Sequence, residues 1–131
     1  MAQTMIDTGF SALAVSVDAA TNETYERIRY GDKLDKFLGN LRMLQSLKAE
    51  RGVRFPVINF NEVLMESNLD EWPSFVKLGH DLGVAGIAAM HISPFKGIGM
   101  ASRCMNQDVK RFNRNLDEAR EIACELGIKV A

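Results

Sequence analysis

The sequence contains few cysteines, no long apolar run and almost no net charge, and each of these features excludes a class of protein. Only Cys104 and Cys124 occur among 131 residues, too few to hold a structural zinc or an iron–sulfur cluster by themselves. Their unpaired spacing suits a reducing compartment, so we expect the protein to be cytoplasmic. On the burial habits of free cysteine, Cys124 is predicted to be a packing residue on a helix beside Ile122 and Leu126.

Membranes and nucleic acids are not expected as partners. No stretch approaches the roughly 20 apolar residues that span a bilayer. The first ten residues, MAQTMIDTGF, lack the basic flank and apolar centre of a signal peptide. The formal net charge of −1 gives no electrostatic reason to bind nucleic acid or an anionic membrane.

Short apolar runs alternate with helical patterns along the whole chain. The composition, 47% hydrophobic and 25% charged, is that of one globular domain. Strands are predicted at 12–17, 55–65, 84–92 and 128–130. Helices are predicted after a cap at Thr21 or Asn22, from Leu34 to Gly52, over 67–83 with Pro73 in the first turn, and over 109–126.

This alternation predicts an α/β fold in which βα units build a parallel sheet. A closed barrel of such units usually needs about 250 residues, so residues 1–131 are expected to form a single incomplete domain. Either the sheet is small and open, or the chain is a piece of something larger. Open parallel edges would leave main-chain groups unpaired, so we also expect self-association or dependence on further sequence.

Polar residues recur near the carboxyl end of each predicted strand. Side chains alternate along a strand, so Ala14, Ser16 and Asp18 share one face, Asn61 shares a face with Asn59, and His91 shares one with Ala89, opposite the apolar face of Ala88, Met90 and Ile92. Parallel α/β folds place their ligands at this edge of the sheet. The pattern therefore predicts a ligand site there.

Each candidate also has a structural alternative. Ser16 and Asp18 are residue types that cap the following turn, and Asn61 is of a type that satisfies buried main-chain groups. His91 has no partner at a metal-site spacing and fits a hydrogen-bonded edge residue. Asn68 with Glu71 resembles a capping box. Glu62 falls on the apolar parity, which disfavours a catalytic role.

Three segments resemble the radical S-adenosylmethionine enzymes, especially the branch with a C-terminal auxiliary-cluster (SPASM-like) domain. They are LAVSVDAATNETYERIRYGDKLDKFLGNLRML, FPVINFNEVLMESNLDEW and LGVAGIAAMHISP. The first resembles a strand that ends in Ser-x-Asp and is followed by a threonine, a tyrosine and Ile-Arg. The matching positions are Ser16, Asp18, Thr21, Tyr25, Ile28 and Arg29.

The resemblance implies that the chain forms about the fourth to sixth βα units of a (β/α)6 partial TIM-type barrel. It implies that Ser16 and Asp18 lie near the cofactor ribose and that Arg29 pairs with the methionyl carboxylate of S-adenosylmethionine. It also implies that Asn61 is an edge asparagine of the next strand, and that the main chain from Met90 to Ile92, which includes His91, lies near the adenine. The family substrate stays open, a peptide or protein included.

The same family holds a [4Fe–4S] cluster on three cysteines of a CxxxCxxC loop, and the cluster reductively cleaves S-adenosylmethionine to a 5′-deoxyadenosyl radical. This sequence has no such loop. We therefore expect a fragment or truncated form that contributes part of the cofactor pocket and the substrate wall and is inactive alone. The alternatives are a stand-alone α/β ligand-binding module and another (β/α) barrel protein without radical chemistry.

Overall fold

The computed structural model describes residues 2–31, 33–92 and 108–131. Within them, four strands form one parallel sheet in the order β1-β2-β3-β4. The strands are β1 (Ala12–Ser16), β2 (Val57–Leu64), β3 (Gly86–His91) and β4 (Lys129–Val130). The predicted α/β fold with alternating βα units is confirmed at this level.

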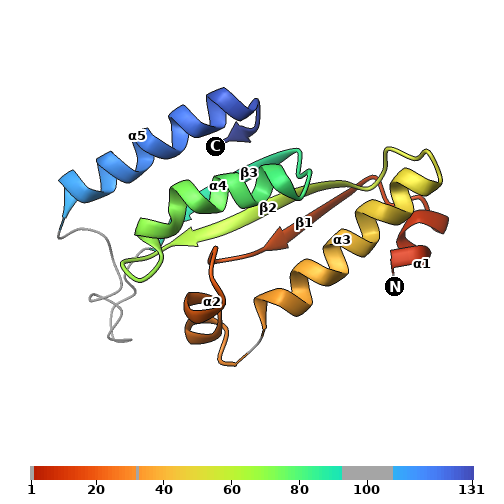
Figure 1. Ribbon diagram of the computed structural model, residues 1–131, viewed down its shortest axis with the longest axis horizontal. Helices are drawn as coiled ribbons and strands as arrows, with labels where there is room; N and C mark the ends of the chain where they lie inside the picture. Colours follow the sequence, from red (N-terminus) through yellow and green to blue (C-terminus); the bar gives the residue numbers. More distant parts are fainter. Residues whose placement is uncertain (1, 32, 93–107) are drawn as a thin grey trace.

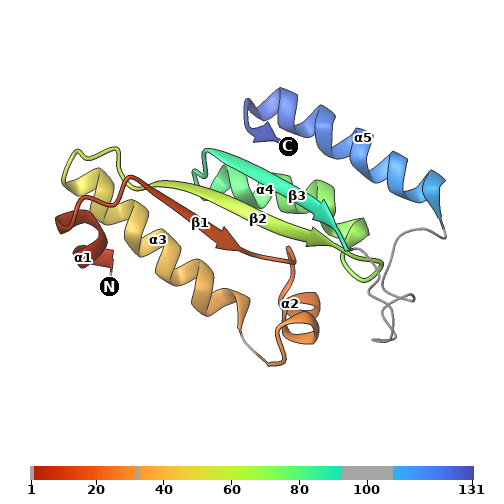
Figure 2. The ribbon, with the colours of Figure 1, turned by 180° about the vertical axis from the view of Figure 1, so that it is seen from behind.

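Helices connect the strands and lie together on one side of the sheet. They are α1 (Ala2–Asp7), α2 (Asn22–Ile28), α3 (Leu34–Glu50), the 3-10 turn η1 (Leu69–Glu71), α4 (Trp72–Asp81) and α5 (Val109–Leu126). Figure 1 shows α4 in front of the strands with α3 and α5 on either side of it, and Figure 2 shows the strands from behind with no helix over them. The sheet therefore has a helix-covered face and an open face.

Local sequence signals explain where the helices begin and end. Thr21 caps α2 by accepting a hydrogen bond from the Thr24 N–H. Pro73 stands in the first turn of α4, where its missing N–H costs little. Gly127 ends α5 with a φ of 68°, in the left-handed region that glycine adopts freely. The short helix α1 was not predicted.

The core lies between the helix-covered face of the sheet and the helices. Phe60 of β2 packs on Phe75 of α4 with ring centroids 5.7 Å apart, and Trp72 stacks on Phe75 at 5.8 Å. A Cβ at Gly79 would stand 2.8 Å from Ile87 Cδ1, so the absence of a side chain lets α4 close on β3. The apolar strand positions thus bury one face, as their period of two predicts.

No helix in the described ranges is both long and apolar enough to cross a membrane. Cys124 is exposed on α5, so its predicted packing role is wrong. The apolar face of α5 is narrow, with Ala119 and Ala123 buried, and Cys124 is one position beyond it. Cys104 lies outside the described residues.

Candidate functional site

The register of the sheet places Ser16 and Asn61 side by side on the open face. Ser16 pairs with Asn61, and Ala14 with Asn59, across β1 and β2. Asn61 in turn pairs with Ala88 of β3. The neighbours of Asn59 and Asn61 on the adjacent strands are alanine, glycine and serine. The Ser16 hydroxyl and the two carboxamides therefore lie on the open face among small residues.

Asp18 belongs to a different environment from Ser16. β1 ends at Ser16, and Asp18 is only 5% exposed. Its Oδ1 accepts a hydrogen bond from the Val63 N–H at 3.0 Å. The preceding step of the same ladder is the bond from the Val17 N–H to the Asn61 carbonyl. The Asp18 carboxylate therefore extends the β1–β2 ladder by one step after the main chain of β1 has turned away.

Arg29 is held by the same carboxylate. Its Nη2 lies 2.5 Å from Asp18 Oδ2 and donates to the Ser16 carbonyl at 3.3 Å. The Nε of Arg29 is buried and has no hydrogen-bond partner among the described residues. Three of the predicted site residues, Ser16, Asp18 and Arg29, are thus brought together where β1 ends, but the guanidinium is already paired.

The expectation that His91 shares a face with these residues is wrong. The register pairs His91 with Leu64, which places it with Ile87 and Phe60 on the helix-covered side of the sheet. His91 is exposed at the end of its strand, and Met90, assigned to the apolar face, is 61% exposed on the open face. Alternation separates the residues of β3 into two faces. Ala88, Ala89 and Met90 are all apolar, so they do not show which of the two faces is buried.

Asn68 and Glu71 do not form the predicted capping box. The Asn68 side chain is buried and bonds three main-chain groups: it donates to the Asp18 and Val63 carbonyls at 2.8 and 2.9 Å, and accepts from the Met65 N–H at 2.7 Å. It therefore ties the loop after β1 to the loop after β2. The spacing of Asn68 and Glu71 suggested that these two residues cap a helix locally. It could not show the long-range bond from Asn68 to the Asp18 carbonyl.

Glu71 caps a segment about fifty residues earlier in the chain. Its Oε2 accepts from the Ala20 and Thr21 N–H groups at 2.8 and 3.2 Å, and its Oε1 accepts from the Thr21 and Thr24 hydroxyls at 2.6 Å each. The carboxylate thus satisfies donors at the start of α2, where negative charge is favoured. It fixes α2 beside the carboxyl end of the sheet.

Glu62 is the most perturbed acid of the region. It lies on the helix-covered face of β2, as its apolar parity predicts, and is fully buried with no hydrogen-bond partner among the described residues for either oxygen. Burial, followed by the charges of Asp18 and Glu71, raises the pKa of Glu62 to about 9. The side chain is therefore protonated and neutral at pH 7.

In the part of the chain that the structure describes, no group of three or more His, Cys, Asp and Glu side chains could hold a metal ion. No protein-family model matches the sequence, and no curated protein matches it. Any functional assignment therefore depends on the residues and their geometry.

Proposed function

We propose that this chain is the later half of a radical S-adenosylmethionine enzyme barrel and contributes part of the pocket for S-adenosylmethionine. The observation that carries the proposal is the pairing of Ser16 with Asn61 on the open sheet face, with Arg29 bonded to the Ser16 carbonyl where β1 ends. It combines a hydroxyl and a carboxamide, suited to a ribose, with a guanidinium, suited to a carboxylate.

The strand order supports a barrel-type arrangement. The four parallel strands follow one another in sequence order. Doubly wound sheets reverse their strand order and carry helices on both faces, whereas barrel strands follow in sequence with the helices outside. A sheet with helices on one face alone has the organisation of a barrel wall, and the open face would be its interior.

The iron–sulfur cluster of that family does not fit this chain. The sequence has two cysteines, separated by nineteen positions and not in a CxxxCxxC pattern, and Cys124 is exposed on α5, away from the open face. The chain is therefore proposed to be catalytically inactive alone. Its own residues would bind and orient S-adenosylmethionine, with Ser16 and Asn61 at the ribose and Arg29 at the methionyl carboxylate.

The pairing of Arg29 with Asp18 limits how Arg29 can bind the methionyl carboxylate. A guanidinium that already contacts a carboxylate through Nη2 can meet a second one only through its remaining nitrogens. Asp18 is accordingly a positioning residue that sets the orientation of Arg29. The same pairing is the observation that favours the second candidate function, a stand-alone ligand-binding module in which Arg29 only stabilises the loop.

Binding of S-adenosylmethionine is tested by NMR on the isotope-labelled chain, which detects weak ligands. We expect millimolar S-adenosylmethionine to shift the Ser16 amide and the Asn61 side-chain amide, and Ser16→Ala with Asn61→Ala to remove the effect. Asn113→Ala, a change at an exposed position of α5, is the matched control. Unchanged spectra at saturating ligand would reject the proposal.

Arg29→Lys separates the two candidate functions. Lysine keeps a charge for Asp18 but loses the second donor group of the guanidinium. If Arg29 binds the carboxylate, this variant weakens binding of S-adenosylmethionine while the chain stays folded by circular dichroism. Anaerobic reconstitution with iron and sulfide should leave the chain without cluster absorbance, and stoichiometric uptake would contradict the claim of inactivity.

A further inference from the structure

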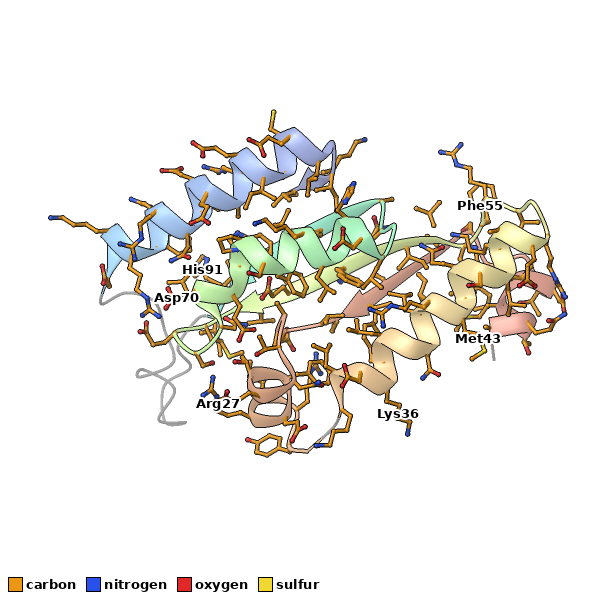
Figure 3. The ribbon with its side chains drawn as sticks, viewed as in Figure 1. Arg27, Lys36, Met43, Phe55, Asp70 and His91 are labelled. Carbon is orange, nitrogen blue, oxygen red and sulfur yellow. The ribbon has the colours of Figure 1, made fainter. Side chains whose placement is uncertain are left out.

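A mostly apolar groove of about 750 Å³ lies beside α3, along the edge strand β1. Its lining residues come from α1, β1 and α3, and none of them is charged. The α3 wall includes a stripe of apolar residues at intervals of three and four, which are Phe37, Leu41, Leu44 and Leu47. Met43 is 54% exposed at the rim, and Figure 3 labels it on α3 near α1. A stripe with this spacing is the surface with which one helix packs on another.

The helix α1 reaches one end of this stripe. Asp7 Oδ1 of α1 lies 2.5 Å from Nη1 of Arg51, the residue that follows α3. Figures 1 and 2 both show α1 beside this end of α3. A helix of six residues is about 9 Å long, whereas the stripe from Phe37 to Leu47 extends over about 15 Å. The part of the stripe near Phe37 therefore lies beyond α1.

The other strands of the sheet show what lies in the corresponding place. The helix that leads into β2 is α3, with 17 residues, and the helix that leads into β4 is α5, with 18 residues. Between them, α4 leads into β3 and packs on α5. Neighbouring strands of this sheet therefore pair under neighbouring helices. In the corresponding position before β1, α1 has six residues.

We propose that the groove holds an amphipathic helix of the preceding βα unit of the barrel, packed along α3 in line with α1. This inference rests on the barrel organisation of the proposed function, and not on binding of S-adenosylmethionine, which concerns the open face. In a barrel, each strand is followed by a helix on the outside that leads toward the next strand. The uncharged groove would take the apolar face of that helix, and the same unit would bring its strand to the edge of β1.

Two other occupants fit the groove less well. An extended segment without a helix would pair with β1 but would leave the α3 stripe beyond α1 uncovered. A second copy of this chain would offer its β4 to β1. The helix over that step would then be α1 itself, because α5 already packs on α4 and β4. The same part of the stripe would stay uncovered, whereas a unit with helical turns of its own beside α3 covers it.

The probe is a capped peptide of about four helical turns, with leucines at intervals of three and four residues and with glutamate, lysine and alanine between them. A control peptide of the same composition carries its leucines at every second position, which is the period of a strand. Each peptide is titrated into the full chain and followed by NMR. We expect the helical peptide to bind and to shift the signals of Leu13, Val15, Phe37 and Met43, and the control peptide to leave them unchanged.

Two matched variants locate the bound peptide. Met43→Lys places a charge at the rim of the groove and should weaken binding of the helical peptide about tenfold. Met90→Lys, at a similarly exposed methionine on the open face, should leave this binding unchanged. Circular dichroism checks that both variants are folded.

Equal binding of both peptides, binding of neither, or binding of the control peptide alone would overturn the proposal. A dimer that Met43→Lys dissociates, in a chain that ignores both peptides, would overturn it in favour of a second copy. S-adenosylmethionine is added to the same samples and followed at Ser16 and Asn61, so that the two proposals can fail separately. A response to this ligand without peptide binding rejects only the helix in the groove. Peptide binding without that response rejects only the S-adenosylmethionine site.

Discussion

The Asp18 carboxylate bonds the Val63 N–H at 3.0 Å and so replaces a main-chain partner at the end of the β1–β2 ladder. With its second oxygen it pairs Arg29. One buried side chain thus completes the sheet and anchors the cation of the proposed site. Stability and binding are coupled at this residue, and the two effects can be separated by choosing the substitution.

Asp18→Ala should destabilise the protein by roughly 2–4 kcal/mol, because it leaves a buried N–H without an acceptor and a partly buried guanidinium without its carboxylate. Asp18→Asn keeps an oxygen for the Val63 N–H and should cost about half as much. Ser16→Ala, at an exposed neighbour, should stay within about 0.5 kcal/mol. Urea unfolding followed by circular dichroism measures all three. Equal losses for Asp18→Ala and Asp18→Asn would show that the ladder bond contributes nothing.

Glu62 should make the protein less stable as the pH rises. Its pKa is about 9 in the folded protein against 4.5 for an exposed glutamate, so between these values the folded state holds a proton that the unfolded state has released. The free energy of unfolding then falls with rising pH, by roughly 1.4 kcal/mol per pH unit at most. Below pH 4.5 the full stability is present.

Glu62→Gln resembles the protonated acid and should remove this slope. The variant should gain stability relative to the wild type between pH 6 and pH 8, as measured by urea unfolding at each pH. Glu23→Gln makes the same charge change at an exposed position of α2 and serves as the control. A wild-type stability that does not change between pH 6 and pH 8 would mean that Glu62 is solvated or paired.

The elements of the fold were predictable because each depends on a short-range signal. Short apolar runs gave all four strands, and Thr21, Pro73 and Gly127 marked helix ends where the structure has them. The alternation of strands and helices predicted parallel pairing, and the structure adds that the strands follow one another in sequence order. The helix α1 was not predicted, because its six residues contain too few turns to show a helical period.

The site was only partly predictable, because its contacts cross long stretches of chain. Parity correctly grouped Ser16 with Ala14 and placed Asn61 beside Asn59, and the register joins the two pairs. It could not show that Asp18 turns back to Val63, since this depends on where β1 ends. Nor could it assign a face to His91, because parity within one strand does not fix its register against the next.

Glu71 should control the order of the segment before α2. Glu71→Ala removes the acceptor of the Ala20 and Thr21 N–H groups, so both amides should exchange with solvent at least tenfold faster, which corresponds to a local loss of about 1.4 kcal/mol. Hydrogen exchange followed by NMR measures this residue by residue. Glu118→Ala, an exposed change on α5, should leave both rates unaltered. Unaltered rates in Glu71→Ala would mean that α2 is held by its apolar contacts alone.

Arg111 should lower the pKa of Asp70 through a two-pronged contact that joins α5 to η1. Its Nε and Nη2 donate to the two Asp70 oxygens at 2.9 and 2.8 Å, and its Nη1 pairs Glu66. The hydrogen bonds from Arg111 are the main cause of the lowered pKa of Asp70. The contact therefore contributes stability above the ordinary pKa of an aspartate, and that contribution is lost as the pH falls through the lowered value.

A lysine at this position cannot make both of the hydrogen bonds that Arg111 donates to Asp70. In Arg111→Lys the pKa of Asp70 should therefore rise toward that of a free aspartate, as measured by NMR titration of its carboxyl carbon. Arg120→Lys alters a looser pair with Asp117 at 3.9 Å and should leave Asp70 unchanged. If Asp70 titrates identically in the wild type and Arg111→Lys, the guanidinium does not hold η1 to α5 in solution. The helix α5 would then be held to this region by the hydrogen bond from Asn115 to Asp70, at 3.1 Å, and by its packing on α4.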